Sequence, residues 1–452
     1  MSDIIAAVAT GMQVSAIGIV RLSGSGCIEL IDRLFFPLSG KKMSQSEDRK
    51  LVFGRLCDRN GETLDVCLCT ISRAPHSYTG EDTAELQCHG SPTVLRAALD
   101  ELFALGARQA GPGEFTKRAF LNGRMELCAA EAVADIIDAE SVECAKNAAG
   151  QLSGALSRRI DGVYAALTDI SGHYHAVLDY PDEDIEDFRL ASYADTLGAA
   201  LKELETLLHS FERGKLMTGG IPAAIIGRPN AGKSSLLNAL LGYDRAIVTD
   251  VPGTTRDTVE EKLKIGRLTL RLIDTAGIRE TEDEVERIGV QRSMDAVKAA
   301  ALVLVVVDGS AELAEADREL IKMAERAPKA VAVMSKNDIA QHAEAPATSL
   351  PVISLSSVTG EGIADLEGTI EELFPLPDVP AGEILTNSRQ ADAVGRAAEY
   401  MRSAIAAMNN GATPDIVLTE TEGAMSALGE LSGRTVREDV TNNIFSRFCV
   451  GK

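Results

Sequence analysis

The stretch "GRPNAGKSS", residues 227–235, directly follows the apolar run "IPAAII", residues 221–226. Gly227, Gly232, Lys233 and Ser234 match the spacing GxxxxGK[ST], in which backbone N–H groups and the start of a helix surround phosphate groups. The apolar run in front of this spacing predicts a strand. The stretch therefore predicts a strand, a phosphate-binding loop and a helix, the central unit of a nucleotide-binding α/β domain.

Working outward, apolar runs alternate with helix-length segments over residues 218–376, as in a parallel α/β sheet. The strands predicted there, besides the first, are "LTLRLID", "ALVLVVVD", "AVAVMS" and "LPVISLS". Helical spacing of apolar residues precedes this region at Leu197, Leu201, Leu204, Leu208 and Phe211, a face that we expect to be core. It resumes afterwards at Met401, Ile405, Met408, Ala424, Leu428 and Leu431. We therefore expect the α/β domain to be inserted into a helical domain made of residues 119–217 and 377–452.

Residues 1–118 predict a separate α+β domain. "AIGIVRLSG", "TLDVCLCTI" and "TAELQCHG" have the pattern of strands. "SPTVLRAALDELFALG" predicts a helix, with Ser91 as its cap, Pro92 in its first turn and Gly106 at its end.

Composition limits the classes of function. The 452 residues carry 45 Lys and Arg against 67 Asp and Glu, a net charge of −22, which disfavours an extended surface for nucleic acid. The eight cysteines form no zinc-type CxxC pair, so we expect reduced thiols and a cytoplasmic location. The apolar runs are too short for a membrane span.

Further motifs indicate guanine nucleotides. Asp274-Thr275-Ala276-Gly277 follows a predicted strand, where the carboxylate can hold Mg²⁺ through water opposite Ser234, and Thr255 in "GTTRD" can add a second ligand. Ser335-Lys336-Asn337-Asp338 resembles NKxD, whose aspartate accepts two N–H bonds from guanine, although Ser335 replaces asparagine and predicts weaker affinity. Ser356-Ser357-Val358 resembles a second base-contact turn. The predicted GTP-binding residues are Asn230, Ala231, Gly232, Lys233, Ser234, Ser235, Thr249, Asp250, Val251, Pro252, Gly253, Thr254, Thr255, Asp274, Thr275, Ala276, Gly277, Ser335, Lys336, Asp338, Ser356 and Ser357.

The residue that follows the DxxG motif is Ile278, where many GTPases carry the glutamine that orients water. Another group must therefore position the attacking water. The nearby polar residues are Arg279, Glu280, Glu282, Asp283, Glu284 and Glu286, and each of them by itself is typical of a solvated helix face.

The segments "GRPNAGKSSLLNALL", "VPGTTRD", "DTAGIRETEDEVERIG" and the terminal "FCVGK" resemble the MnmE (TrmE) family of tRNA-modification GTPases. The resemblance extends through "GIVRLSG", "SYTGEDTAELQCHG" and "PGEFTKRAFLNGRMELCAAEAVADIIDA", and so covers nearly the whole chain. It implies a folate-binding, dimerising N-terminal domain, a helical domain and an inserted GTPase domain. It also implies a homodimer that works with the flavoprotein MnmG, as a heterotetramer, to modify C5 of the wobble uridine of certain tRNAs with a one-carbon unit from 5-formyltetrahydrofolate or a related folate.

The resemblance also assigns roles to individual residues. It implies that Glu286 positions water, that Ser234 and Thr255 bind Mg²⁺, and that a potassium ion lies beside the phosphates. The implied potassium ligands are Asn230, Thr249, Val251 and Thr254, whereas turn chemistry alone would make Asn230 a loop-stabilising amide.

The implied folate ligands are Arg21, Glu85, Arg124 and Lys452. Taken alone, Glu85 would be an ordinary strand-surface residue. Arg124 stands where the family more usually has lysine, and "GMQVSAIG" replaces a glycine-rich stretch. Cys449 in "FCVGK" is implied to take part in the modification chemistry, although a thiol near a terminus is ordinarily incidental.

Two other classes of function remain open at this stage. A ribosome-assembly GTPase acting as an RNA-binding switch would share the nucleotide motifs, but the chain has no GxxG loop of the KH type. A membrane-associated or transport-linked GTPase is disfavoured because no apolar span is present.

Overall fold

The computed structural model describes residues 3–179, 190–243, 261–273, 297–339, 344–375, 380–435, 438–446 and 448–451. The chain divides into two compact units. The first unit contains Met1–Asp135, Gln151–Ala200 and Arg396–Lys452, and the second contains Ile136–Gly150 and Leu201–Gly395.

The first unit contains a seven-stranded sheet in the order β3-β4-β5-β6-β2-β1-β7. Its strands are β1 Ile5–Val8, β2 Ser15–Ser23, β3 Phe35–Pro37, β4 Val52–Cys57, β5 Thr63–Ser72, β6 Thr83–Gly90 and β7 Arg108–Gln109. Neighbouring strands are antiparallel except for β1 and β7, which are parallel. The three strands predicted in this region are confirmed as β2, β5 and β6.

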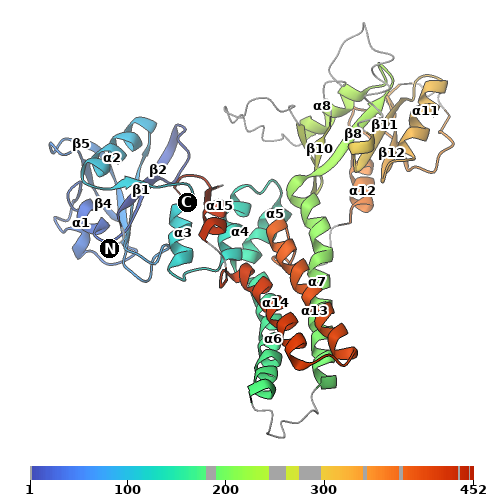
Figure 1. Cartoon of the computed structure of the whole chain (residues 1–452). Coiled ribbons are helices and arrows are strands. Elements are labelled where there is room, and N and C mark those ends of the chain that lie inside the picture. Colours follow the sequence, from blue (N-terminus) through green and yellow to red (C-terminus); the bar gives the residue numbers. More distant parts are fainter. Residues whose placement is uncertain are drawn as a thin grey trace. The chain divides into compact units, whose positions relative to one another are not determined.

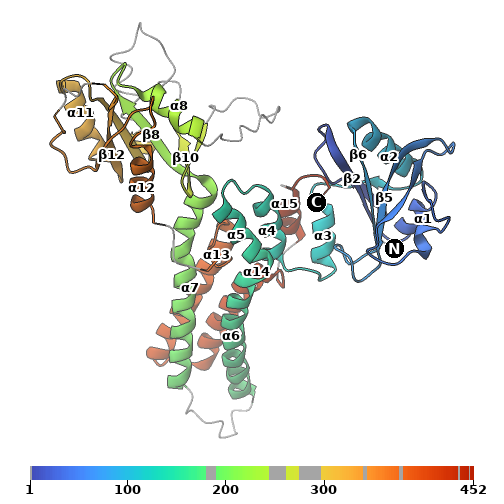
Figure 2. The same ribbon diagram turned by 180° about the vertical axis from the view of Figure 1, so that it is seen from behind.

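Helices α1 Cys27–Ile31 and α2 Pro92–Ala104 cover one face of this sheet, and their apolar residues form a single core with the inward side chains of the strands (Figure 2). A 3₁₀ turn, Met43–Gln45, also contributes to this core. Ser91 occupies the N-cap position of α2, as predicted, although its side chain makes no capping hydrogen bond. Pro92 at the start of the helix lacks an N–H, which leaves one donor fewer to satisfy.

Before and after the α/β region the described chain forms the helices α3 Glu114–Leu121, α4 Leu127–Ile137, α5 Val142–Leu152, α6 Ala155–Asp179, α7 Leu190–Gly219, α13 Ser388–Asn409, α14 Pro414–Ser432 and α15 Glu438–Ser446. Within the first unit α6 and α14 lie side by side (Figure 1). The buried stripe of α7 is Leu197, Ala200, Leu204 and Leu207. The predicted face was therefore displaced, because Leu201, Leu208 and Phe211 lie at the edge of that stripe and are only partly buried.

The second unit contains a six-stranded sheet in the order β13-β12-β11-β8-β10-β9. Its strands are β8 Ile221–Gly227, β9 Glu261–Ile265, β10 Leu268–Leu272, β11 Leu302–Asp308, β12 Ala330–Ser335 and β13 Val352–Ser354. All pairings are parallel except the one between β9 and β10, and β9 was not predicted. Helices α8 Lys233–Tyr243 and α12 Ile363–Leu373 pack on one face, and α11 Glu315–Ala324 packs on the other. The predicted parallel α/β domain is confirmed.

The chain that leaves this α/β domain packs against two helices that precede the domain in the sequence, α5 and α7. The Asn147 side chain in α5 donates to the Ile384 carbonyl and accepts the Gly382 N–H, at 3.0 and 2.9 Å. A Cβ atom on Gly214 of α7 would lie 1.9 Å from the Leu385 carbonyl oxygen, so only glycine allows this approach. The predicted class is thus confirmed: an α/β domain inserted between helical segments and preceded by an α+β domain.

Within these described ranges, no helix has the length and apolar character that crossing a membrane requires.

Candidate functional site

The loop between β8 and α8 has the backbone shape of a phosphate cradle. Asn230 and Gly232 have φ values of 62° and 99°, in the left-handed region that asparagine and glycine tolerate best. A Cβ on Gly227 would lie 2.5 Å from the Val306 carbonyl oxygen, which explains the glycine at the end of β8. Loops of this kind turn successive N–H groups toward one concavity, and α8 begins at the next residue.

Lys233 is held against this loop. Its Nζ donates to the carbonyl oxygens of Gly227 and Arg228 at 2.9 and 2.8 Å. Burial lowers the pKa of Lys233, because the charged form loses part of its hydration. A phosphate in the cradle would restore a full counter-charge to this ammonium, so the group suits an anionic ligand.

Ser335 connects the turn predicted to contact the base to the predicted phosphate loop. Its hydroxyl lies 2.6 Å from the carbonyl oxygen of Ala231 in the loop and 3.0 Å from that of Val307 at the end of β11. The side chain is 2% exposed. Although it is shorter than the asparagine of the motif, this hydroxyl therefore reaches the loop backbone directly.

The other residues predicted to contact the base follow the carboxyl ends of β12 and β13. Ser356 Oγ donates to Asp338 Oδ1 at 2.6 Å, which fixes the orientation of the carboxylate. Lys336, at φ 62°, donates to Asp308 Oδ2 at 2.5 Å. Burial by itself would raise the pKa of Asp308, but the Lys336 and Ser310 hydrogen bonds lower it below its usual value. Ser357 adjoins this group and is half-buried.

Several predicted residues lie outside the described ranges. They are Thr249, Asp250, Val251, Pro252, Gly253, Thr254, Thr255, Asp274, Thr275, Ala276, Gly277, Glu286 and Lys452. The described part of the predicted nucleotide site therefore consists of the loop, Lys233, Ser234 and Ser235, and the two turns predicted to contact the base.

Two of the predicted folate ligands lie opposite each other on neighbouring strands. Arg21 of β2 pairs in register with Glu85 of β6, and Arg21 Nε lies 2.7 Å from Glu85 Oε1. The Arg21 guanidinium also lies 5.8 Å from the ring centroids of both Tyr78 and Phe115. Sequence reasoning missed these two rings, since nothing in a linear pattern shows that they flank β2.

Arg124 follows α3 and packs beside the connection between β5 and β6. A Cβ on Gly80 in that connection would lie 3.2 Å from Arg124 Cγ. Tyr78 belongs to the same connection, and its hydroxyl is 2.9 Å from the hydroxyl of Thr116 in α3. One segment of chain thus contacts both predicted arginines.

Main-chain contacts hold the C-terminal tail against the α+β domain. The Gly113 N–H donates to the Cys449 carbonyl at 3.3 Å, and Val450 forms an isolated antiparallel β-bridge with Pro112. Figures 1 and 2 show this end of the chain beside α3 and β2. Cys449 is exposed, whereas the other seven cysteines are buried, so it is the thiol that a bound substrate could reach.

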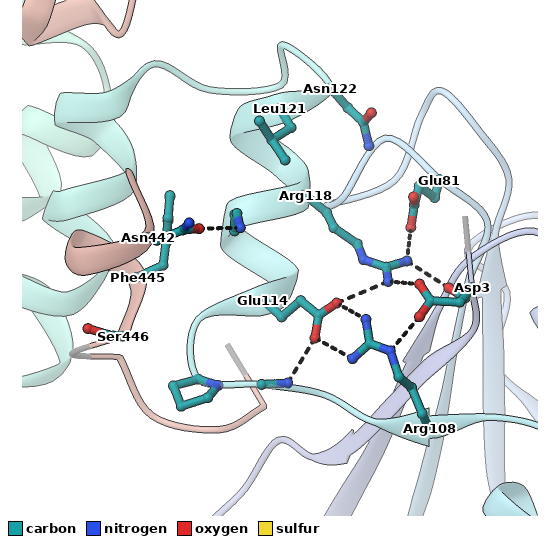
Figure 3. A pocket seen from close by; sticks show the side chains of 13 residues that line it. Asp3, Glu81, Arg108, Glu114, Arg118, Leu121, Asn122, Asn442, Phe445 and Ser446 are labelled. Carbon is teal, nitrogen blue, oxygen red and sulfur yellow. Dashed lines mark hydrogen bonds and ion pairs between the residues drawn. The ribbon is translucent and has the colours of Figure 1, made fainter. Parts of the chain in front are cut away.

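A cavity of about 540 Å³ lies between α3 and α15 (Figure 3). Arg118 bonds to Asp3, Glu81 and Glu114 on its wall, at 2.7, 2.9 and 3.1 Å. Burial would raise the pKa of Glu114, but hydrogen bonds from Arg108, the Gly111 N–H and Arg118 lower it. Sequence reasoning missed this network. Because these opposite charges pair with one another, the network fixes α3 to the segment before β1 and to the connection before β6.

Two family models match the chain: residues 4–124 match the GTP-binding protein TrmE N-terminus, and residues 127–449 match the MnmE helical domain. The tRNA modification GTPase MnmE of Symbiobacterium thermophilum is 40% identical over 455 residues, covering 100% of this chain and 99% of the relative. That of Moorella thermoacetica is 41% identical over 466 residues, covering 100% of both. Among solved structures, the G domain of the T. maritima FeoB iron transporter is 29% identical, with a TM-score of 0.26, over 34% of this chain and 97% of that one.

Proposed function

Because the chain belongs to the MnmE family of tRNA-modification GTPases, we propose that its GTP hydrolysis drives modification at C5 of the wobble uridine of certain tRNAs. The observation that carries this proposal is the identity of about 40% over the full length of both chains. The proposed partner is the flavoprotein MnmG, in a heterotetramer, and the proposed one-carbon source is 5-formyltetrahydrofolate or a related folate. The proposed location is the cytoplasm, which suits eight free thiols.

In the proposed nucleotide site, the loop N–H groups and Lys233 bind the phosphates, and Asp338 accepts the guanine N–H groups. The hydrogen bond from Ser356 supports this assignment, because it orients the Asp338 carboxylate that would accept both N–H groups. Ser234 and Thr255 are the proposed Mg²⁺ ligands. When bound, Mg²⁺ supplies positive charge to the β- and γ-phosphate oxygens.

We propose that Asn230 is a potassium ligand, together with Thr249, Val251 and Thr254, and that Glu286 positions water. Ile278 in place of the usual glutamine supports a different arrangement for hydrolysis. Potassium beside the phosphates supplies the charge that an arginine finger supplies in other GTPases. In this proposal the potassium ion makes an arginine from another protein unnecessary, and two G domains meet during the cycle to close the potassium-binding loop.

An exposed apolar face on the N-terminal sheet supports the proposed homodimer. Phe53 and Val66 are 51% and 40% exposed on the face opposite α1 and α2, and Ile17 is 59% exposed. The register of β4, β5, β6 and β2 places the Arg21–Glu85 pair on this same face. The proposed dimer interface and folate site are therefore neighbours on one sheet. Burial of this face would stabilise a pair of chains.

In the folate site we propose that the Glu85 carboxylate accepts the paired N–H donors of a pterin, and that Arg21, Arg124 and Lys452 bind the anionic tail. The Arg21–Glu85 bond supports this role, since it keeps Glu85 oriented. Cys449, exposed and tethered by its backbone, is proposed to take part in the modification reaction.

The test is nucleoside analysis of tRNA from cells that lack this chain. We expect the C5-modified wobble uridine to disappear and to return with the wild-type gene. A Cys449→Ser variant should hydrolyse GTP at the wild-type rate without restoring the nucleoside. An unchanged set of wobble nucleosides in the deletion strain would refute the proposed function.

A further inference from the structure

The side chains of Asp65, Cys67 and Cys88 converge at one end of the pairing between β5 and β6, two inner strands of the N-terminal sheet, apart from the sites described above. One ligand atom of each residue lies within 4.8 Å of the others. This is the one group of metal-ligating side chains so arranged in the described ranges. Cys67 and Cys88 are 4% and 1% exposed.

The cluster lies where the pairing of β5 and β6 ends. Leu68 and Gln87 are the last pair in register, and Cys67 and Cys88 are the next residues on the two strands. Both cysteines belong to the core beneath α2. A hydrogen bond between the two thiols, together with burial, raises the pKa of Cys67.

Asp65 links β5 to β6 beyond the last paired residues, through contacts of its side chain with His89. Its Oδ2 accepts the His89 N–H at 2.8 Å, and its Oδ1 lies 2.7 Å from His89 Nδ1. The Asp65 side chain is 9% exposed, whereas that of His89 is 75% exposed. The carboxylate is thus fixed between two buried thiols and an imidazole that solvent can reach.

We propose that this cluster binds one Zn²⁺ ion through the thiolates of Cys67 and Cys88 and the carboxylate of Asp65, with water as the fourth ligand. Two sulfurs and one oxygen within this spacing suit tetrahedral zinc rather than Mg²⁺ or K⁺, which prefer oxygen ligands. His89 is a positioning residue, because its hydrogen bonds orient the carboxylate. Binding releases the two thiol protons to solvent and requires no oxidant.

The ion would cross-link β5 and β6 at the end of their pairing. The other end carries the connection between the two strands that contacts Arg21 and Arg124. It would therefore stiffen the sheet that carries the Arg21–Glu85 pair. This role is separate from GTP hydrolysis, and the inference does not depend on the proposed function.

The test is cobalt substitution in the purified full-length chain under reducing conditions. We expect about one Co²⁺ per chain, with a thiolate-to-cobalt charge-transfer band that Zn²⁺ abolishes. Cys67→Ser and Cys88→Ser should each lose this band. Cys69→Ser is the matched control, because Cys69 is equally buried on the same face of β5 but lies outside the cluster.

Asp65→Asn keeps the size of the side chain and guards against a failure of the cysteine variants to fold. It should weaken Co²⁺ binding by about tenfold or more. A wild-type chain without the charge-transfer band would overturn the proposal, as would an equal band in the Cys67→Ser and Cys88→Ser variants. Formation of a Cys67–Cys88 disulfide in air, with no metal uptake after reduction, would overturn it as well.

Discussion

Replacing Ser335 with alanine removes the hydroxyl that joins β12 to the phosphate loop. In the wild-type chain this hydroxyl lies 2.6 Å from the Ala231 carbonyl and 3.0 Å from the Val307 carbonyl. A hydroxyl carries one proton and donates to only one of these two carbonyls at any moment. The substitution therefore removes one hydrogen bond and leaves one carbonyl without its donor. The residue is buried, and water cannot easily take its place.

The loss of such a bond costs about 1–2 kcal/mol, and 1.4 kcal/mol corresponds to a factor of about ten in affinity. In the wild-type chain the bond holds the loop in place before the nucleotide binds. In the variant the loop must be ordered during binding, and this cost lowers the affinity. We therefore expect the Ser335→Ala variant to bind GTP and GDP about tenfold more weakly, as measured by equilibrium titration with a fluorescent analogue. Its preference for guanine should persist, because Asp338 is unchanged.

Thr369→Ala is a suitable control, since its hydroxyl also donates to a backbone carbonyl, that of Asp365, on the exposed side of α12. Its affinity for GTP should stay within about twofold of the wild-type value. If Ser335→Ala also bound GTP within about twofold of wild type, the contact would not order the loop, and the reasoning would be refuted.

Three further substitutions and one change of salt test other parts of the account. The Asp338→Asn variant should lose the preference for GTP and gain the ability to bind xanthosine triphosphate. Unchanged GTP binding in a competition assay would contradict this. Replacing KCl with NaCl at equal ionic strength should slow hydrolysis sharply, whereas equal rates would remove the potassium proposal. Gly214→Ala should lower the free energy of unfolding, measured by urea titration, by about 1–3 kcal/mol, because its Cβ would lie 1.9 Å from the Leu385 carbonyl oxygen; a gain in stability would refute the tight approach. Since the folded-state pKa of Glu114 is lowered, its contribution to stability is present above the unfolded pKa of about 4.3 and is lost as pH falls through the folded value. Glu114→Gln should flatten the dependence of the free energy of unfolding on pH in this range, measured by urea titrations at several pH values. An unchanged pH dependence would count against the Arg108–Glu114 pairing.

Local patterns were sufficient for the phosphate loop and most of the strands. The spacing of Gly227, Gly232 and Lys233 encodes backbone shape within a few residues, and the apolar runs correctly predicted β8, β10, β11, β12 and β13. The charged strand β9, "EKLKI", gave no such apolar signal and was missed. The face of α7 was displaced because helical spacing alone does not say from which direction a partner packs.

The sequence by itself thus determined the inserted α/β domain, its phosphate loop and the residues expected to contact guanine nucleotides. Only the tertiary structure decided which side chains meet across long separations. It joined Ser335 to a loop carbonyl 104 residues away, paired Arg21 with Glu85 across 64 residues, and placed Cys67 beside Cys88. The physical reason is that such partners depend on strand register and on the packing of distant segments, whereas a linear pattern records only what neighbouring residues require of the backbone.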